Sequence, residues 1–264
     1  MQRTCCAVWL LALLHWASCQ TLNFQVDWRS AGVVVEPSVR ADSTLVVNER
    51  QLILYGGRNQ TEPQFRRSTG VANSSLSSAE SQTLVAGPDL MQFNLVSKAW
   101  HVPSVNLSRG SPGPRYGHVA RALPGLDAMV LHGGFASDSV KGDLWVYDVT
   151  NSAWHKPTIS GSLPRPAARG YHTLTWEPAT ETKPNEGAFL MHGGLGTAEY
   201  QSNHSVLGDV WALQINCTMA TVNQTKLLEC TAVWTELRDV SGSNSVNIQR
   251  YGHATTCFFW GNQG

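Results

Sequence analysis

A pattern of residues that returns several times along the chain limits the folds that this chain can adopt. Its most regular copy runs from Arg115 to Trp154 and holds four short apolar runs, separated by breaks rich in Gly, Pro, Asp and Asn. Runs of this length that are rich in Val, Leu, Trp and Tyr are typical of β-strands. Four such strands in succession predict a sheet whose apolar face must pack against a neighbouring copy.

The marks of the pattern keep the same order in every copy. Arg115 and Arg169 stand 54 positions apart, which is the uninterrupted period. The marks are the opening arginines Arg115, Arg169 and Arg250; the pairs Gly56-Gly57, Gly133-Gly134 and Gly193-Gly194; the third-strand aspartates Asp89, Asp143 and Asp209; and the fourth-strand tryptophans Trp100, Trp154 and Trp234. The first copy begins near Arg40, where Asp42 and Ser43 replace the Gly-His of later copies.

An apolar strand that ends in Gly-Gly, followed by Asp-Leu-x-x-Tyr/Phe and then Trp, resembles the kelch repeat, and the resemblance covers most of the chain. It implies an all-β, kelch-type β-propeller with three four-stranded blades and the start of a fourth, an incomplete ring. We expect the blades at about 40–105, 115–160, 169–240 and, in part, 250–264 within a kelch region of 40–264. Because propellers usually close with four to eight blades, we expect the chain to be the N-terminal part of a longer protein.

The N-terminal residues predict a secretory leader. Residues 1–19 carry one positive charge, an apolar run from Ala7 to Leu14 and small residues before a cleavage position after Cys19, which is typical of a signal peptide. A buried N-terminal strand is the alternative. No later run is long enough to span a membrane, so no span is expected within residues 20–264.

Residues 20–39 precede the first copy and hold Asn23 to Trp28. The step from Trp28 to Arg40 resembles the step from each fourth-strand Trp to the next opening Arg. The segment is therefore a candidate closing strand of the last blade, and an extended leader with one incidental Trp is the alternative.

Six Asn-x-Ser/Thr sites agree with secretion and lie in breaks between predicted strands. They are Asn59, Asn73, Asn106, Asn203, Asn216 and Asn223. Together with the leader, they predict a glycoprotein that is secreted or lies at the extracellular face of the cell surface.

Several insertions interrupt the repeats. Arg58 to Pro88 is rich in Ser, Thr, Asn and Gln; a loop of this length is either functional or disordered, and its composition favours disorder. Asp209 and Trp234 stand 14 positions further apart than the equivalent pair in the other copies, and the excess matches the segment from Cys217 to Cys230. Because the ends of this insertion should be close, we expect a disulfide between the two cysteines. Cys257 is either a half-buried strand residue or the partner of a downstream cysteine.

The charge balance argues against nucleic acid or an anionic membrane as partner, since Lys plus Arg and Asp plus Glu both number 19 and no basic tract is present. The Gly-Gly pairs lack the following helix and Lys-Ser/Thr of phosphate loops. Arginines and aspartates that recur once per copy are expected to hold loops through charge-assisted hydrogen bonds.

The histidines form two series, and packing is favoured over metal binding for both. The first series is His118, His172 and His253; the second is His132 and His192, where the first copy has Tyr55. No nucleophile motif is present, so no catalytic, cofactor-binding or metal residues are expected.

The resemblance implies a non-catalytic scaffold for recognition of an extracellular protein or glycan, with contacts on loops. The alternative is a copper radical oxidase similar to galactose oxidase. Such an enzyme needs a cysteine linked to a tyrosine, for which Cys257 is a candidate without a supporting local motif.

Overall fold

A computed structural model describes residues 37–38, 40–48, 50–58, 89–137, 139–161, 164–178, 187–196, 205–222, 225–237 and 249–255. The chain divides into two compact units, Met1–Gly32 and Val33–Gly264, and all described residues belong to the second. The leader, the candidate closing strand Asn23–Trp28, Cys257, the loop after Arg58 and the sequons at Asn59, Asn73, Asn203 and Asn223 lie outside the described residues.

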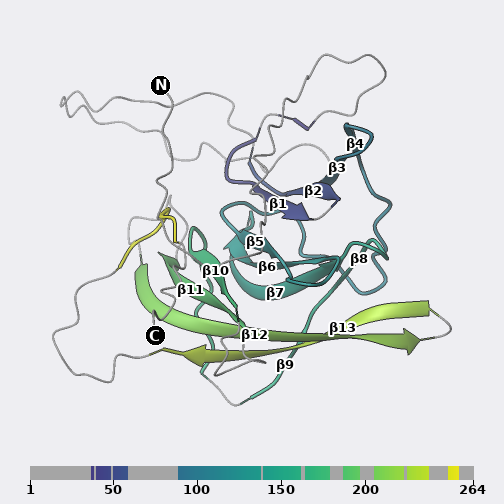
Figure 1. The fold of residues 1–264 in the computed structure, drawn as a ribbon. Coiled ribbons are helices and arrows are strands. Elements are labelled where there is room, and N and C mark those ends of the chain that lie inside the picture. Colours follow the sequence, from purple (N-terminus) through teal and green to yellow (C-terminus); the bar gives the residue numbers. More distant parts are fainter. Residues whose placement is uncertain are drawn as a thin grey trace, which may run out of the picture. The chain divides into compact units, whose positions relative to one another are not determined.

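The described residues form three sheets, which confirms the all-β prediction (Figure 1). The first sheet holds β1 (Thr44–Asn48), β2 (Gln51–Tyr55), β3 (Leu90–Asn94) and β4 (Ala99–His101). The second holds β5 (Val119–Ala122), β6 (Ala128–Phe135), β7 (Val140–Asp148) and β8 (Ala153–His155). The third holds β10 (Thr173–Glu177), β11 (Ala188–Leu195), β12 (Val206–Val222) and β13 (Thr225–Glu236), with β9 (Thr158–Ile159) at its edge.

Each sheet follows the predicted order of antiparallel neighbours, but the third has five strands instead of four. The additional strand is β9, which pairs in parallel with β13 through Thr231↔Thr158 and Ala232↔Ile159. The sequence places Thr158 and Ile159 within the second copy. A two-residue strand has too short a pattern to reveal that it crosses to the next sheet.

The predicted insertion between the last two strands of the third copy is not a loop. β12 and β13 continue as one long hairpin, paired from Trp211↔Glu236 to Val222↔Thr225 (Figure 1). Cys217 and Cys230 face each other in this register and form a disulfide, with a Cα–Cα distance of 4.1 Å. The predicted pairing is therefore present, between adjacent strands instead of at the ends of a loop.

The tip of this hairpin is fixed to the second sheet. Arg109 pairs with the carboxylate of Glu229 at 2.7 Å. The Asn151 amide donates to the carbonyl of Lys226 at 3.0 Å. Leu228 is buried between the sheets. The hairpin therefore extends the contact between the third sheet and the second.

Apolar side chains on the facing surfaces of neighbouring sheets form clusters that join the sheets. The first and second sheets share a cluster that includes Val46, Ile53, Leu131 and Trp154. The second and third share a larger cluster. The apolar face of each predicted sheet is thus buried against the next copy, which is the arrangement that a repeat of this length requires.

Candidate functional site

The opening arginines and third-strand aspartates form buried clamps inside their own sheets. Arg115 donates to both carboxylate oxygens of Asp143, at 2.6 and 3.1 Å, and to the carbonyl of Gly133 at 3.0 Å. Arg169 binds Asp209 in the same two-pronged way, at 2.6 and 2.7 Å. Both arginines are almost fully buried. The expected loop-holding role of these residues therefore agrees with their contacts.

The clamp determines the charge state of the two carboxyls. Burial alone would raise the pKa of Asp143, but the hydrogen bonds and charge of Arg115 lower it below its ordinary value. The same balance lowers the pKa of Asp209 beside Arg169. Each aspartate is therefore ionised and engaged, so it does not offer an acid or base for chemistry near neutral pH.

Sequence reasoning missed a third member of each clamp. The indole nitrogen of Trp145 donates to Asp143 at 2.7 Å, and that of Trp211 donates to Asp209 at 2.6 Å. The spacing Asp-x-Trp, which recurs in the second and third copies, could have indicated this contact. The first sheet has Met91 at this place, and there the pKa of Asp89 is raised by burial, against the opposing charge of Arg40.

The Gly-Gly pairs hold each sheet to the next. The second glycine of each pair donates its N–H to the carbonyl of the next opening arginine: Gly57 to Arg115 at 2.9 Å, Gly134 to Arg169 at 2.8 Å and Gly194 to Arg250 at 2.8 Å. A Cβ at Gly134 would lie 2.8 Å from both the Tyr116 carbonyl and the His118 Cβ. This close approach, together with positive φ, requires glycine.

The expectation that these pairs end their strands is wrong for two of the three. Gly133-Gly134 and Gly193-Gly194 lie inside β6 and β11, at an irregularity in the register with the next strand. The strands resume for one residue beyond them. The pairs thus mark a bulge, which re-aims the backbone toward the neighbouring sheet.

A relay of backbone hydrogen bonds links the first segments of successive sheets. Gly117 N–H donates to the Asp42 carbonyl at 3.0 Å, Tyr171 N–H to Gly117 at 2.7 Å and Gly252 N–H to Tyr171 at 2.9 Å. All four residues have φ between 52° and 62°. Asp42 and Tyr171 accept this conformation without being glycine, and the Tyr171 hydroxyl donates to the Asp42 carboxylate at 3.0 Å.

The two histidine series meet in pairs across the sheet boundaries. His132 Nδ1 lies 3.0 Å from His172 Nε2, and His192 Nδ1 lies 3.1 Å from His253 Nε2. Where the first sheet has Tyr55, His118 Nε2 instead pairs with the Thr44 hydroxyl at 2.8 Å. The favoured packing role thus includes a direct hydrogen bond between neighbouring sheets.

Burial lowers the pKa of His118, His132 and His172 and keeps them neutral. Desolvation, and then the charge of a nearby arginine, lower the pKa of His118 and of His132 to about 3. Desolvation, and then His132, lower the pKa of His172 well below its ordinary value. Within the described residues, no group of three His, Cys, Asp or Glu side chains is placed to hold a metal ion. The copper oxidase alternative therefore gains no support from this part of the chain.

Two of the three fourth-strand tryptophans contact an aromatic ring of another sheet. Trp154 packs on Tyr55 with ring centroids 5.1 Å apart, and Trp234 packs on His132 at 5.2 Å. Trp100 instead contacts Phe93 of its own sheet at 5.3 Å. Every class of repeated mark thus makes structural contacts within or between the sheets.

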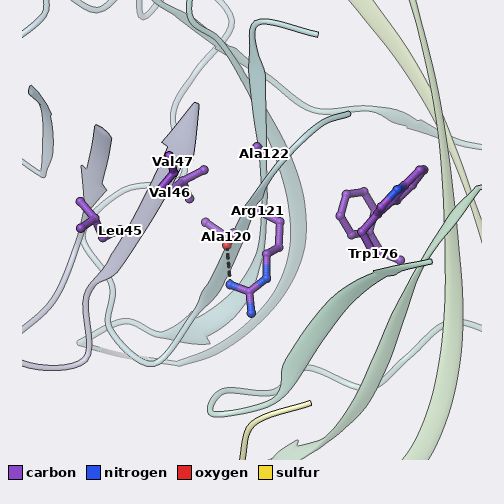
Figure 2. Close-up of a pocket in the computed structure, with 8 residues that line it drawn as sticks. Leu45, Val46, Val47, Ala120, Arg121, Ala122 and Trp176 are labelled. Atoms are coloured by element: carbon purple, nitrogen blue, oxygen red, sulfur yellow. Dashed lines mark hydrogen bonds between the residues drawn. The ribbon is translucent and has the colours of Figure 1, made fainter. Parts of the chain in front are cut away.

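One hollow among the non-repeated residues lies between the first strands of the three sheets (Figure 2). This first-strand groove measures about 260 Å³. Its walls are Leu45, Val46 and Val47 of β1, Ala120, Arg121 and Ala122 of β5, Trp176 of β10 and Phe189 of β11. Figure 2 shows the Arg121 side chain between the β1 residues and Trp176. Most of the residues that line the groove are thus apolar, and Arg121 is the single cationic residue among them.

Two sequons lie among the described residues, and both have exposed asparagines. Asn106 is outside the named strands and donates its backbone N–H to the Ser152 carbonyl. Asn216 is within β12 and pairs with Thr231, so the expectation that it lies in a break between strands is wrong. The reason is the continuation of β12 and β13 through the predicted insertion.

The comparisons with known proteins agree with this geometry. A family model described as the KLHDC2/KLHL20/DRC7 Kelch-repeats domain matches residues 11–260. The chain belongs to the kelch-repeat family. The match begins inside the predicted leader. An F-box/kelch-repeat protein of Arabidopsis thaliana is 29% identical over 185 residues, which cover 68% of this chain and 31% of the relative. This chain therefore aligns with about a third of that relative's length.

Kelch-repeat membership confirms the family suggested by the Gly-Gly, Asp and Trp marks. A kelch-repeat domain is typical of a protein-interaction scaffold, and the fold alone does not determine what such a domain binds. Across the ranges that the structure describes, no helix has the length and apolar character needed to cross a membrane.

Proposed function

We propose that this kelch-repeat protein is a non-catalytic recognition scaffold that acts outside the cell and binds an extracellular protein or glycan. The proposal rests on one observation, which is that the repeated polar residues make contacts within the scaffold. The buried arginines and ionised aspartates bind one another and the backbone of their own copy, and the paired histidines bind each other across sheet boundaries. These groups fix the scaffold, and recognition falls to the residues and loops that do not repeat.

The extracellular setting is supported by covalent chemistry. A structural disulfide such as Cys217–Cys230 persists in oxidising compartments and is rare in the cytosol. Asn106 and Asn216 are exposed sequon asparagines, so their side chains are accessible for glycosylation. The leader-like residues 1–19 provide a route to that compartment.

Expression of the full chain in a secretory eukaryotic host tests the setting. We expect the medium to contain a protein whose mobility increases after endoglycosidase treatment and whose Cys217 and Cys230 resist alkylation until reduced. Retention inside the cell with both thiols free would refute the extracellular proposal. Substituting Asn106→Gln and Asn216→Gln identifies the share of the glycan that each site carries.

The recognition role needs a separate assay. The secreted protein is screened against a glycan array and a displayed set of extracellular domains, and each hit is measured for saturable binding. We expect a specific ligand whose affinity is unchanged in variants of surface residues outside its contact area. Turnover of substrate by the purified protein, with no saturable macromolecular ligand, would contradict a non-catalytic scaffold.

A further inference from the structure

The only charged residue that lines the first-strand groove has no ionic partner within the described ranges of the chain. Arg121 makes one hydrogen bond, from its guanidinium to the carbonyl of Ala120 at 3.0 Å (Figure 2). Among the residues that the structure describes, no carboxylate forms an ion pair with it. Arg115 and Arg169, by contrast, each hold an aspartate in a two-pronged clamp. A guanidinium has five N–H donors and stays charged in proteins, so most donors of Arg121 remain available.

Arg121 is itself an exposed residue, but the apolar residues beside it take part of its side chain out of water. The groove is lined by Leu45, Val47 and Trp176, and burial lowers the pKa of Arg121 without any opposing carboxylate. A charged group set beside apolar walls gains most from a ligand that brings the opposite charge into the same partly desolvated space. The charge therefore favours an anion, and the walls favour an anion with an apolar body.

The dimensions and the aromatic wall narrow the class of ligand. Trp176 and Phe189 lie with ring centroids 4.9 Å apart and form one aromatic side of the groove. A cavity of roughly 150 Å³ is enough to hold benzene. The groove, at about 260 Å³, can accept a ring with a short acidic tail.

We propose that the first-strand groove binds a small organic carboxylate with a flat apolar body, which stacks on the aromatic side and pairs its carboxylate with Arg121. This site is separate from the recognition of a macromolecule proposed above. It brings together residues of three sheets, because β1, β5, β10 and β11 all contribute to the wall. Occupancy therefore links the first sheet to the third.

The probe is 3-phenylpropionate, compared with its neutral amide by calorimetry or ligand-detected NMR on the full chain. We expect saturable binding of the acid, at least tenfold weaker binding of the amide, and weaker binding of the acid as salt increases. Arg121→Gln should weaken acid binding at least tenfold. Arg121→Lys keeps the charge without the planar fork and should have an intermediate effect.

Arg165→Gln is the matched control, since Arg165 is exposed and does not line the groove. Its affinity for the acid should equal that of the wild type. Circular dichroism establishes that each variant is folded before its binding is measured. Equal affinity for acid and amide, unchanged binding in Arg121→Gln, or no saturable binding at millimolar acid would each overturn the proposal. Selective binding of an acidic peptide instead of the small acid would also overturn it.

Discussion

Acidification from about pH 7.5 to pH 5 should destabilise the protein through the histidines buried between its sheets. His118 and His132 have pKa values of about 3 in the folded protein, against an ordinary value of 6.5. Below pH 6.5 the unfolded chain therefore binds protons that the folded protein excludes. Stability is fully present above that pH and is lost progressively as the pH falls toward 3.

The magnitude follows from the pKa values. One pH unit corresponds to about 1.4 kcal/mol for each group that titrates only in the unfolded state, so at pH 5 each histidine costs about 2 kcal/mol. His118 and His132 together should lower the free energy of unfolding by about 4 kcal/mol, and His172 adds to this in the same direction. The clamped carboxyls do not interfere, because their lowered pKa values place their effect below this pH range.

Urea denaturation followed by tryptophan fluorescence, at closely spaced pH values, measures the loss. His132→Gln keeps a hydrogen-bonding group beside His172 but cannot titrate. It should therefore remove about half of the stability loss that His118 and His132 cause together. His101→Gln, at an exposed histidine outside the network, should retain the full pH dependence. A wild-type stability that is flat from pH 7.5 to 5, or an unaltered slope in His132→Gln, would refute this reasoning.

Three further changes test the other contacts. Arg169→Met should lower the free energy of unfolding by about 3–5 kcal/mol in urea, because it leaves Asp209 partly buried without its partner. Cys217→Ser with Cys230→Ser should cost about 3 kcal/mol in the chain-entropy model and lower the melting temperature in calorimetry. Gly134→Ala should destabilise by more than about 1 kcal/mol, as judged by thermal denaturation, because both its φ and its neighbours reject a Cβ.

Each of these changes has its own comparison. Gly125→Ala has a similar positive φ but no atom within 4 Å of the new Cβ, so it isolates backbone strain from the clash. Equal losses at Gly125 and Gly134 would contradict a packing role for the latter. Asp209→Asn keeps the shape of the clamp without its charge, and a loss close to zero would show that charge contributes little there. Addition of reductant to the wild type should reproduce the effect of the two serine substitutions.

The repeat pattern was sufficient to predict the class of fold and the residues that hold it together. The period, the Gly-Gly pairs and the short apolar runs are local signals, and the three sheets reproduce their order. The role of these arginines and aspartates in holding loops could be predicted because both residue types recur at fixed places in the repeat. The pairing of Cys217 with Cys230 could be inferred because an insertion between two antiparallel neighbours has its ends close together, although the structure places both cysteines within a continuous hairpin.

What the sequence did not reveal depends on contacts between copies. The partner of His132 is 40 positions away, in another sheet, and no local spacing identifies it. β9 is too short to show a period of its own. The continuation of β12 and β13 looks like an insertion because it lengthens the spacing from Asp209 to Trp234 relative to the other copies. Arg121 is an exposed strand arginine, and only the folded structure places it beside β1 residues and Trp176 of other sheets.

The relay through Asp42, Gly117, Tyr171 and Gly252 has a direction, since every N–H points back along the chain to the carbonyl of the preceding sheet. Its donors and acceptors are main-chain atoms, so side chains at these positions can diverge wherever a positive φ is tolerated. A duplicated copy would present the same donor to one neighbour and the same acceptor to the other. Its main-chain hydrogen bonds would therefore match those of both neighbouring sheets. Because the relay has a direction, the added copy could fit in only one orientation.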